Sequence, residues 1–449
     1  MKQLYFLLFL AALGSMAWGQ QYRVVDYDLR LDIGHLQANT IAGSARMRVV
    51  PTCYTSEPLQ LSLGSASVDS VWVDGRWRQD FSYADGTLSL PTAGVEDPFE
   101  VEIFYHSPGQ VEGYGWGGFH WNSNIAYNLG VAFGEYPHCY GRSWYPCIDA
   151  FDQKATYSME LTSPIGWTTT ASGIRDTAWF NPDGSETSHW TLANPTPSYL
   201  LSVACGPFHY IRKQVAGYPT VIAFGSQDSA AVAQAFAQLD QVVPMFERCF
   251  GPYRWGSIGY TGTPQGSMEH VNNISLHNSA MTDLTQAGQG TMAHELSHNW
   301  FGNLVTCATS GDMWFNEGGA SFCEEVAAEG VHGKAYADGV YQENLYSVLQ
   351  QTHLSDGGYF PLYGPTPDRT YGSTTYDKGA TAWHSLRGLL GEELYYSAMQ
   401  RLFADLAFGN VSTAQLLDSL ESYTGVDLKE FFRFHIYSPG FVDYCLEAF

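Results

Sequence analysis

The most restrictive feature of this sequence is the pentapeptide at residues 294–298, which reads H-E-L-S-H. Residues four apart share one face of an α-helix, so His294 and His298 can reach a single metal ion. The residues around them, from 292 to 301, are largely apolar, which predicts a buried helix. Burying two imidazoles and a carboxylate is costly unless they are paired or bound to a metal. The chain is therefore expected to fold around an internal metal site.

This spacing predicts a catalytic zinc centre. Zinc takes imidazole nitrogen ligands at roughly 2.0–2.1 Å, and a catalytic zinc site keeps one coordination position for water. Glu295 follows His294 directly and lies close to the same helix face, where its carboxylate can accept a proton from the attacking water. We expect one zinc ion per chain, with Glu295 as the general base.

A catalytic site of this kind needs a third protein ligand. Glu317 follows His298 after 18 intervening residues and opens the next predicted helix, so we expect it to complete the metal site. Asp312, Glu324 and Glu325 are the alternatives nearby. Glu324 lies two helical turns beyond Glu317, and we expect it to accept a hydrogen bond from a ligating histidine.

The periodicity of the apolar residues changes near the middle of the chain. Residues 27–33 and 99–105 alternate between apolar and polar, as half-buried strands do, and Asp-Gly pairs at 74–75 and 85–86 mark hairpin turns. Five later stretches have apolar faces at helical spacing: 230–250, 285–301, 317–329, 379–390 and 412–423. We predict a multidomain α+β protein, with an antiparallel β-sandwich or saddle at residues 20–210. An α/β catalytic domain follows at 211–449, after the strand-like run 199–204.

Composition excludes several classes of protein. Apolar residues make up 45% of the 449 residues, which is far from the composition of a disordered chain. The formal net charge of −24 opposes binding to nucleic acid and to anionic membrane surfaces. We therefore expect no nucleic-acid partner.

Residues 1–19 are predicted to be a signal peptide. Lys2 precedes an apolar run at residues 4–13, and the small residues Ala17 and Gly19 stand before a cut at Gln20. The run is shorter than the about 20 residues of a membrane-spanning helix; an uncleaved anchor is the alternative. We expect an exported protein, periplasmic or secreted, with no stable membrane span after cleavage.

The cysteines do not form any C-x-x-C pair, although the chain has eight of them. Export would permit disulfides, and Cys139 with Cys147 is the first pair to examine. Buried free thiols are the alternative.

The residues around the metal motif resemble the M1 family of zinc aminopeptidases, gluzincins that include aminopeptidase N and leukotriene A4 hydrolase. Residues 294–306 read HELSHNWFGNLVT, and residues 312–320 read DMWFNEGGA, with Gly319 where the family usually has phenylalanine. The resemblance implies that the catalytic domain is thermolysin-like. It also implies His294, His298 and Glu317 as the zinc ligands.

Residues 266–270, G-S-M-E-H, resemble the family's G-x-M-E-N exopeptidase motif and lie shortly before the metal motif. By this resemblance Glu269 binds the free α-amine of the substrate, and Gly266, Ser267 and Met268 belong to the substrate site. His270 departs from the family's asparagine, which bears on substrate preference and pH dependence.

Residues 376–380, Y-D-K-G-A, resemble the family's Y-x-K-G motif. The resemblance implies that Tyr376 donates a hydrogen bond to the oxyanion formed when the substrate carbonyl is attacked. Tyr371, five residues earlier, is a further candidate for the pocket.

Many family members also carry a pocket glutamine nine residues before a proline, at the place of Pro146 here. Pro137 stands at the glutamine position in this sequence, with Glu135 and His138 as nearby alternatives. The residues of the first specificity pocket therefore do not carry over from the family.

The resemblance extends over nearly all of the chain after residue 20 and implies a short form without the C-terminal helical domain of larger members. It implies a zinc-dependent aminopeptidase acting on peptides with a free N-terminus. One alternative is a thermolysin-type endopeptidase, which would cut blocked peptides at internal bonds without needing Glu269. The other is a catalytically retired peptide-binding protein.

Overall fold

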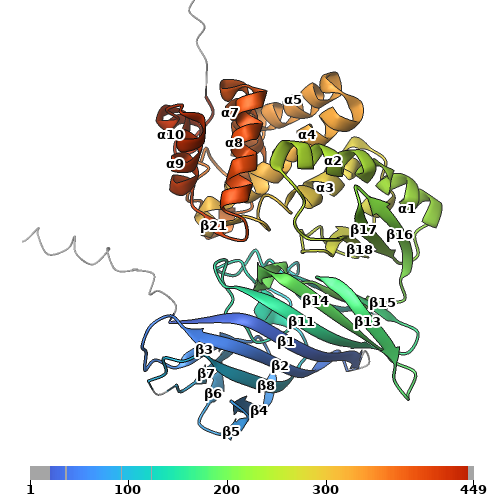
Figure 1. The fold of residues 1–449 in the computed structure, drawn as a ribbon. Coiled ribbons are helices and arrows are strands. Elements are labelled where there is room, and N and C mark those ends of the chain that lie inside the picture. The colour runs from blue at the N-terminus through green and yellow to red at the C-terminus, as the bar shows by residue number, and fades with distance from the viewer. Residues whose placement is uncertain (1–20, 36–37, 93, 123, 443–449) are drawn as a thin grey trace, which may run out of the picture.

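The protein consists of a sheet-rich amino-terminal part and a helix-rich second part that pack against each other (Figure 1). The computed structural model describes residues 21–442 except 36, 37, 93 and 123, so the predicted signal peptide at 1–19 lies outside the described residues. Within the described part, no helix combines the length and apolar character needed to cross a membrane.

The amino-terminal part is built from strands β1 to β15. Their bounds are β1 (Tyr22–His35), β2 (Thr40–Pro51), β3 (Leu59–Ser62), β4 (Ser67–Val73), β5 (Arg76–Arg78), β6 (Ser82–Ala84), β7 (Thr87–Leu90), β8 (Phe99–Ser107), β9 (Gly118–Asn122), β10 (Ile125–Leu129), β11 (Lys154–Ser163), β12 (Thr168–Ala171), β13 (Ile174–Phe180), β14 (Glu186–Pro197) and β15 (Val203–Gly206). They form an eight-stranded sheet in the order β13-β14-β11-β1-β2-β8-β4-β5, a four-stranded sheet β12-β15-β10-β9 and a three-stranded sheet β3-β7-β6.

The alternating segments fold as the sequence predicted. Residues 27–33 lie in β1 and residues 99–105 in β8, and the Asp-Gly pairs close the β4–β5 and β6–β7 hairpins. Asp74 and Asp85 adopt positive φ at these turns, as such hairpins require. The expected wholly antiparallel arrangement is wrong at one place, because β1 pairs with β11 in parallel. The rings of Tyr27 and Tyr157 stack across this pair with their centroids 5.1 Å apart.

The second part begins with a mixed sheet of β16 (His209–Val215), β17 (Tyr218–Phe224), β18 (Ile258–Thr263) and β19 (Ile274–His277). Ten helices of this part lie among the described residues: α1 (Ser229–Ala235), α2 (Leu239–Phe250), α3 (Gln286–Ser297), α4 (Gly319–His332), α5 (Lys334–Gln350), α6 (Thr352–Ser355), α7 (Gly379–Leu390), α8 (Glu392–Asp405), α9 (Thr413–Thr424) and α10 (Lys429–His435). Two short strands, β20 (Thr306–Cys307) and β21 (Asn410–Val411), pair in parallel, and β21 lies below α8 and α9 in Figure 1.

The predicted helices differ in how well they match these bounds. The predicted helix 379–390 coincides with α7, and the prediction for 412–423 is one residue from α9. The stretch 230–250 is broken into α1 and α2 by a 3₁₀ turn at Phe236–Gln238. The strand expected at 199–204 is wrong in its first half, where Ser198–Leu200 form a 3₁₀ turn before β15.

Several contacts join the two parts near the site. The Gly130 N–H donates to His270 Nε2 at 3.3 Å, and the Val271 N–H donates to the Leu200 carbonyl at 3.1 Å. Since β15 belongs to an amino-terminal sheet and β16 to the second part, the chain passes between them at residues 207–208. A division at residue 210 into separately folding domains stays a prediction.

The cysteines of the described residues are free thiols, so the disulfide considered between Cys139 and Cys147 is not formed. Both side chains are fully buried. They therefore contribute as small apolar core residues.

Candidate active site

Helix α3 carries the H-E-L-S-H motif into the core of the second part. Thr285 caps its first turn by accepting a hydrogen bond from the Gly288 N–H, and His298 ends the helix. Met292, Ala293 and Leu296 are buried, as the apolar sequence predicted. The histidines and Glu295 are therefore held by a helix that cannot easily shift.

The side chains predicted to bind the metal stand at the separations that zinc requires. The Nε2 atoms of His294 and His298 lie 3.4 and 3.5 Å from Oε2 of Glu317. Two atoms bound to one tetrahedral zinc at roughly 2.0–2.1 Å lie about 3.3–3.4 Å apart. Since these three residues also form a group of mutually close donor atoms, they fit one zinc ion.

Hydrogen bonds fix both imidazoles in the tautomer that zinc needs. His294 Nδ1 donates to Glu324 Oε1 at 2.9 Å, and His298 Nδ1 donates to the Phe301 carbonyl at 2.9 Å and to Asn316 Oδ1 at 2.8 Å. Because these partners are acceptors, each Nδ1 carries the proton and each Nε2 lone pair is available to the metal. The structure places Glu324 in the supporting position expected from its spacing.

The charges around the site also favour a cation. Burial favours the neutral form of His298, but the carboxylates of Glu269 and Glu317 outweigh it and raise its pKa to about 9. Burial alone would raise the pKa of Glu317, yet the two imidazoles lower it to about 2. Glu295 is buried as well. Three carboxylates thus surround two imidazoles, and a divalent cation would replace the protons that they attract.

The other acidic residues near Glu317 have different partners. Asp312 Oδ1 accepts from the Thr413 N–H and hydroxyl at 2.7 and 2.8 Å, and Glu325 binds His384 and Arg387. Neither belongs to the group of close donor atoms that contains Glu317. Glu317 is therefore the carboxylate that the structure brings to the two histidines.

Glu317 and Tyr376 are presented by two π-helical turns, Trp314–Gly318 and Thr374–Lys378, which lead into α4 and α7. Such turns are rare and occur often at functional sites. The two turns cross at Gly318 and Gly379, where a Cβ atom added to either glycine would lie 2.7 or 2.6 Å from the other's Cα. The crossing holds Tyr376 at the metal site, with its ring 6.2 Å from that of His294.

Glu269 lies beside these groups with its side chain 4% exposed. Its segment pairs with β19 through the Met268 N–H to Ser275 carbonyl bond and the reciprocal bond, 2.9 and 3.0 Å long. The Asn303 amide donates to the Glu269 carbonyl at 2.7 Å, and Asn316 Nδ2 lies 3.4 Å from Oε1. Burial raises the pKa of the Glu269 carboxyl group.

The remaining residues of this segment are arranged around Glu269. Met268 is buried and Gly266 and Ser267 are half-buried, while Ser267 Oγ accepts from the His277 N–H at 3.3 Å. The structure therefore brings the 266–269 segment, the metal-binding residues and Tyr376 together at one place.

Comparison with known proteins agrees with this geometry. Residues 240–435 match the model of the peptidase family M1 domain. The chain carries a peptidase family M1 domain. Aminopeptidase B of Mus musculus is 27% identical over 403 residues, and leucine aminopeptidase 2 of Vanderwaltozyma polyspora is 22% identical over 431 residues. The alignments span 82% and 89% of this chain but only 58% and 63% of those longer proteins.

Two solved structures share the fold. The M1 zinc metallopeptidase of Deinococcus radiodurans has a TM-score of 0.81 at 20% identity, over 94% of this chain and 95% of its own. Native yeast LTA4 hydrolase has a TM-score of 0.79 at 21% identity, over 95% of this chain and 69% of its own. The expected architecture, a β-rich part followed by a zinc-peptidase domain, is confirmed. The donor atoms of His294, His298 and Glu317 in this domain fit one catalytic zinc ion.

The structure explains both departures from the family pattern in this M1 domain. A Cβ atom at Gly319 would lie 2.3 Å from Phe301 Cδ1, so the Phe301 ring fills the space beside this position. His270 Nε2 accepts from the Gly130 N–H, its Nδ1 pairs with Ser275 Oγ at 3.1 Å, and burial lowers its pKa to about 3. His270 therefore links the two parts, and its lowered pKa favours the neutral ring.

The sequence did not point to Asn316 or to the partners of Tyr371. Asn316 joins two functions, since it accepts from His298 and contacts Glu269; its place directly before Glu317 was the only signal. The Tyr371 ring contacts those of Phe133 and His138, at 5.1 and 5.2 Å between centroids.

The Gly318–Gly379 crossing gives a testable expectation. Gly379→Ala should separate the two π-helical turns, lowering the zinc content and destabilising the fold by about 1–3 kcal/mol, as overpacking does. Metal analysis and thermal unfolding measure both effects. Gly388→Ala is the matched control, because Gly388 lies on the same helix with no atom within 4 Å of an added Cβ. A Gly379→Ala protein that matches this control would refute the positioning role of the crossing.

Tyr376→Phe should lower kcat by about 10²- to 10³-fold, as loss of one oxyanion donor does, with a smaller change in KM. The hydroxyl's bond strengthens only as negative charge develops on the substrate oxygen, so the ground state loses less. Steady-state kinetics of the zinc-loaded variant measure this, with Tyr371→Phe as the control. A normal kcat in Tyr376→Phe would assign the donor role to another residue such as Tyr371.

Proposed function

We propose that the protein is a zinc-dependent aminopeptidase that hydrolyses the N-terminal peptide bond of peptides. The observation that carries this proposal is the place of Glu269. Donor atoms of Glu269, Glu295 and His298 all lie within 4.8 Å of one another. A buried carboxylate favours a charged hydrogen-bond donor, and a substrate ammonium bound there leaves only the first peptide bond next to Glu295.

The side chains divide the reaction among them. Zinc held by His294, His298 and Glu317 would supply Lewis-acid chemistry at the scissile carbonyl. The Glu295 carboxylate takes a proton from the attacking water and delivers it to the leaving amine. The Tyr376 hydroxyl donates to the oxygen on which negative charge develops. Glu269 orients the substrate by its α-ammonium group.

The names of the relatives support this choice over an endopeptidase. The similar curated proteins are aminopeptidase B and leucine aminopeptidase 2. In addition, Glu269 has a substrate group to bind in an exopeptidase but none in an endopeptidase. A retired binding protein would not need Glu295 and Tyr376 beside an intact set of metal ligands.

A screen of fluorogenic aminoacyl amides tests the proposal. We expect hydrolysis that is lost with a chelator and restored by zinc, and no cleavage of an internally quenched peptide blocked at both ends. Cleavage of the blocked peptide would favour the endopeptidase. Zinc binding without hydrolysis of any amide would favour the binding protein.

We also propose that residues 1–19 direct export and are removed before Gln20, since they combine a basic start, an apolar run and small residues before the cut. The amino-terminal sequence of the protein recovered from a cell fraction or culture medium tests this. A mature chain that still begins at Met1 in the cytoplasm would contradict it.

A further inference from the structure

An aromatic group from three separate segments lies beside Tyr371. We call it the aromatic wall and define it as Trp116, Phe133, His138 and Tyr371. The centroid of Phe133 lies 4.7 Å from that of Trp116 and 5.1 Å from that of Tyr371, and His138 lies 5.2 Å from Tyr371. Tyr371 shortly precedes the π-helical turn that presents Tyr376, and Gly130, at the base of the loop that carries Phe133 and His138, donates to His270 directly after Glu269. The wall therefore lies beside the turn that carries Tyr376 and the segment that carries Glu269, the two groups assigned to the first residue of a substrate.

The loop that carries Phe133 and His138 is closed at its base. The Tyr140 N–H donates to the Gly130 carbonyl at 2.8 Å, and the Ala132 N–H donates to the His138 carbonyl at 2.9 Å. The His138 ring returns a bond from Nδ1 to the Ala132 carbonyl, also at 2.9 Å. These bonds close the loop but do not fix the Phe133–Gly134 tip against Tyr371.

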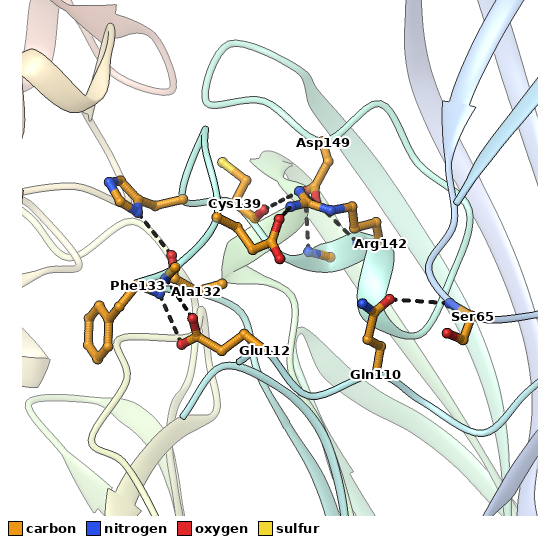
Figure 2. Close-up of polar contacts among 12 residues, drawn as sticks. Ser65, Gln110, Glu112, Ala132, Phe133, Cys139, Arg142 and Asp149 are labelled. Carbon is orange, nitrogen blue, oxygen red and sulfur yellow. Dashed lines mark hydrogen bonds and ion pairs between the residues drawn. The ribbon is translucent and has the colours of Figure 1, made fainter. Parts of the chain in front are cut away.

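The Glu112 carboxylate holds the Phe133–Gly134 tip of the loop in place (Figure 2). It is 4% exposed and accepts from the Phe133 N–H at 3.0 Å and the Gly134 N–H at 2.6 Å. It also accepts from the Gly117 N–H at 3.1 Å, which closes the turn that carries Trp116. One buried side chain thus holds two segments of the wall, and charge-assisted bonds of this kind are the strong ones.

The same turn contacts the substrate segment of the second part. Gln265, the residue directly before Gly266, donates from Nε2 to the Gly115 carbonyl at 3.1 Å. Arg142 holds the outer side of the loop, through bonds to the Cys139 carbonyl at 2.7 Å and to Glu135 at 3.1 Å (Figure 2). Glu135 is therefore engaged away from the wall, with 40% of its side chain exposed.

We propose that Glu112 is a positioning residue that holds the aromatic wall in place, and that this wall makes the enzyme selective for large apolar or aromatic first residues. The proposal rests on the proposed aminopeptidase function. The partly exposed rings of Trp116, Phe133 and Tyr371 offer contact area to a large apolar side chain and little to alanine. His138 is fully buried and supports the Tyr371 ring. Because the Glu112 carboxylate accepts its hydrogen bonds from the backbone N–H groups of Gly117, Phe133 and Gly134, its effect on the substrate passes through the wall.

Glu112→Gln tests the role, with Glu135→Gln as the matched control on the same loop. The glutamine keeps one acceptor oxygen but turns an NH₂ group toward backbone N–H donors, so at least one of them loses its partner. We expect kcat/KM for a phenylalanine amide, relative to an alanine amide, to fall by about 10-fold, mostly through KM. Zinc content and kcat on the alanine amide should stay near wild type. Glu135→Gln should leave the ratio unchanged.

Two further measurements test the Glu112 anchor and the selectivity of the wall separately. Amide hydrogen exchange at Phe133 and Gly134 should become faster in Glu112→Gln, whether or not the enzyme is active, and unchanged exchange would overturn the anchor. Phe133→Leu removes a ring from the wall without touching Glu112 and should lower the same kcat/KM ratio. An unchanged ratio in that variant, or equal losses in Glu112→Gln and Glu135→Gln, would overturn the selectivity. If the wild-type protein cleaved no aminoacyl amide, the proposed function would be overturned instead. The hydrogen exchange at Phe133 and Gly134 would still test whether Glu112 anchors the loop.

Discussion

Glu295→Gln should give a protein that folds, binds zinc and turns over substrate about 10²- to 10⁴-fold more slowly, the range that one general acid–base group contributes. Glutamine has nearly the shape of glutamate, and Glu295 does not belong to the group of donor atoms formed by His294, His298 and Glu317. The metal site therefore stays intact, while the group that moves the proton is lost.

The control for this variant is its metal content, because a partly loaded protein would also be slow. Stoichiometric zinc and an unchanged melting temperature have to be shown before the rates are compared. A fully metallated Glu295→Gln protein with a rate within a few-fold of wild type would remove Glu295 from its role as the base.

Glu317→Ala should lose zinc and, with it, nearly all activity. Only the two Nε2 donors of His294 and His298 would remain, one protein ligand fewer than catalytic zinc sites have. The substitution also removes a buried carboxylate that lies 3.4 and 3.5 Å from those donors. Zinc content after dialysis against a weak chelator measures the effect directly.

Glu324→Gln is the graded control for Glu317→Ala. The glutamine amide oxygen can still accept the bond from His294 Nδ1, so zinc should remain bound, with an affinity lowered by about 10- to 100-fold as for other outer partners of ligating histidines. Tightly held, stoichiometric zinc in Glu317→Ala would contradict the assignment of the third ligand.

The metal site was predictable because its spacing is local. Residues four apart on one helix must share a face, so His294 and His298 follow from the sequence alone, and the distances between their Nε2 atoms and Glu317 agree with the expected donors. The place of Tyr376 was not derivable in this way. It depends on two turns that cross at Gly318 and Gly379, which are 61 residues apart in the sequence. The turns can approach this closely because neither residue has a side chain.

Strand periodicity predicted β1 and β8, but it could not predict their partners. The parallel pairing of β1 with β11 is a long-range contact between residues about 130 positions apart. Among the helices, α5, α6, α8 and α10 were not predicted. In α5 the apolar pattern is weak, because few of its residues are buried, namely Ala337, Val340 and Val348. The aromatic wall could not be predicted for the same reason as the strand pairing, because it depends on contacts between segments that are separated in the sequence. Glu112, for example, binds the N–H groups of Phe133 and Gly134 in another loop.

We expect the free amine of the substrate, held by Glu269, to direct hydrolysis to the first peptide bond. Acetylating the amine removes its charge and leaves the buried carboxylate without its partner. Truncating one member of a buried charge pair commonly costs about 2–5 kcal/mol, or about 30- to several-thousand-fold. The effect should therefore be large and specific to this group.

The most direct test compares leucine amide with N-acetyl-leucine amide reporters in the wild-type protein and in Glu269→Ala, both loaded with zinc. We predict rapid hydrolysis of the free amide by the wild-type protein, little hydrolysis of the acetylated one, and a much smaller difference in Glu269→Ala because the free substrate slows. If the wild-type protein cleaved free and acetylated substrates equally well, the aminopeptidase account would be wrong, although the zinc site would stand.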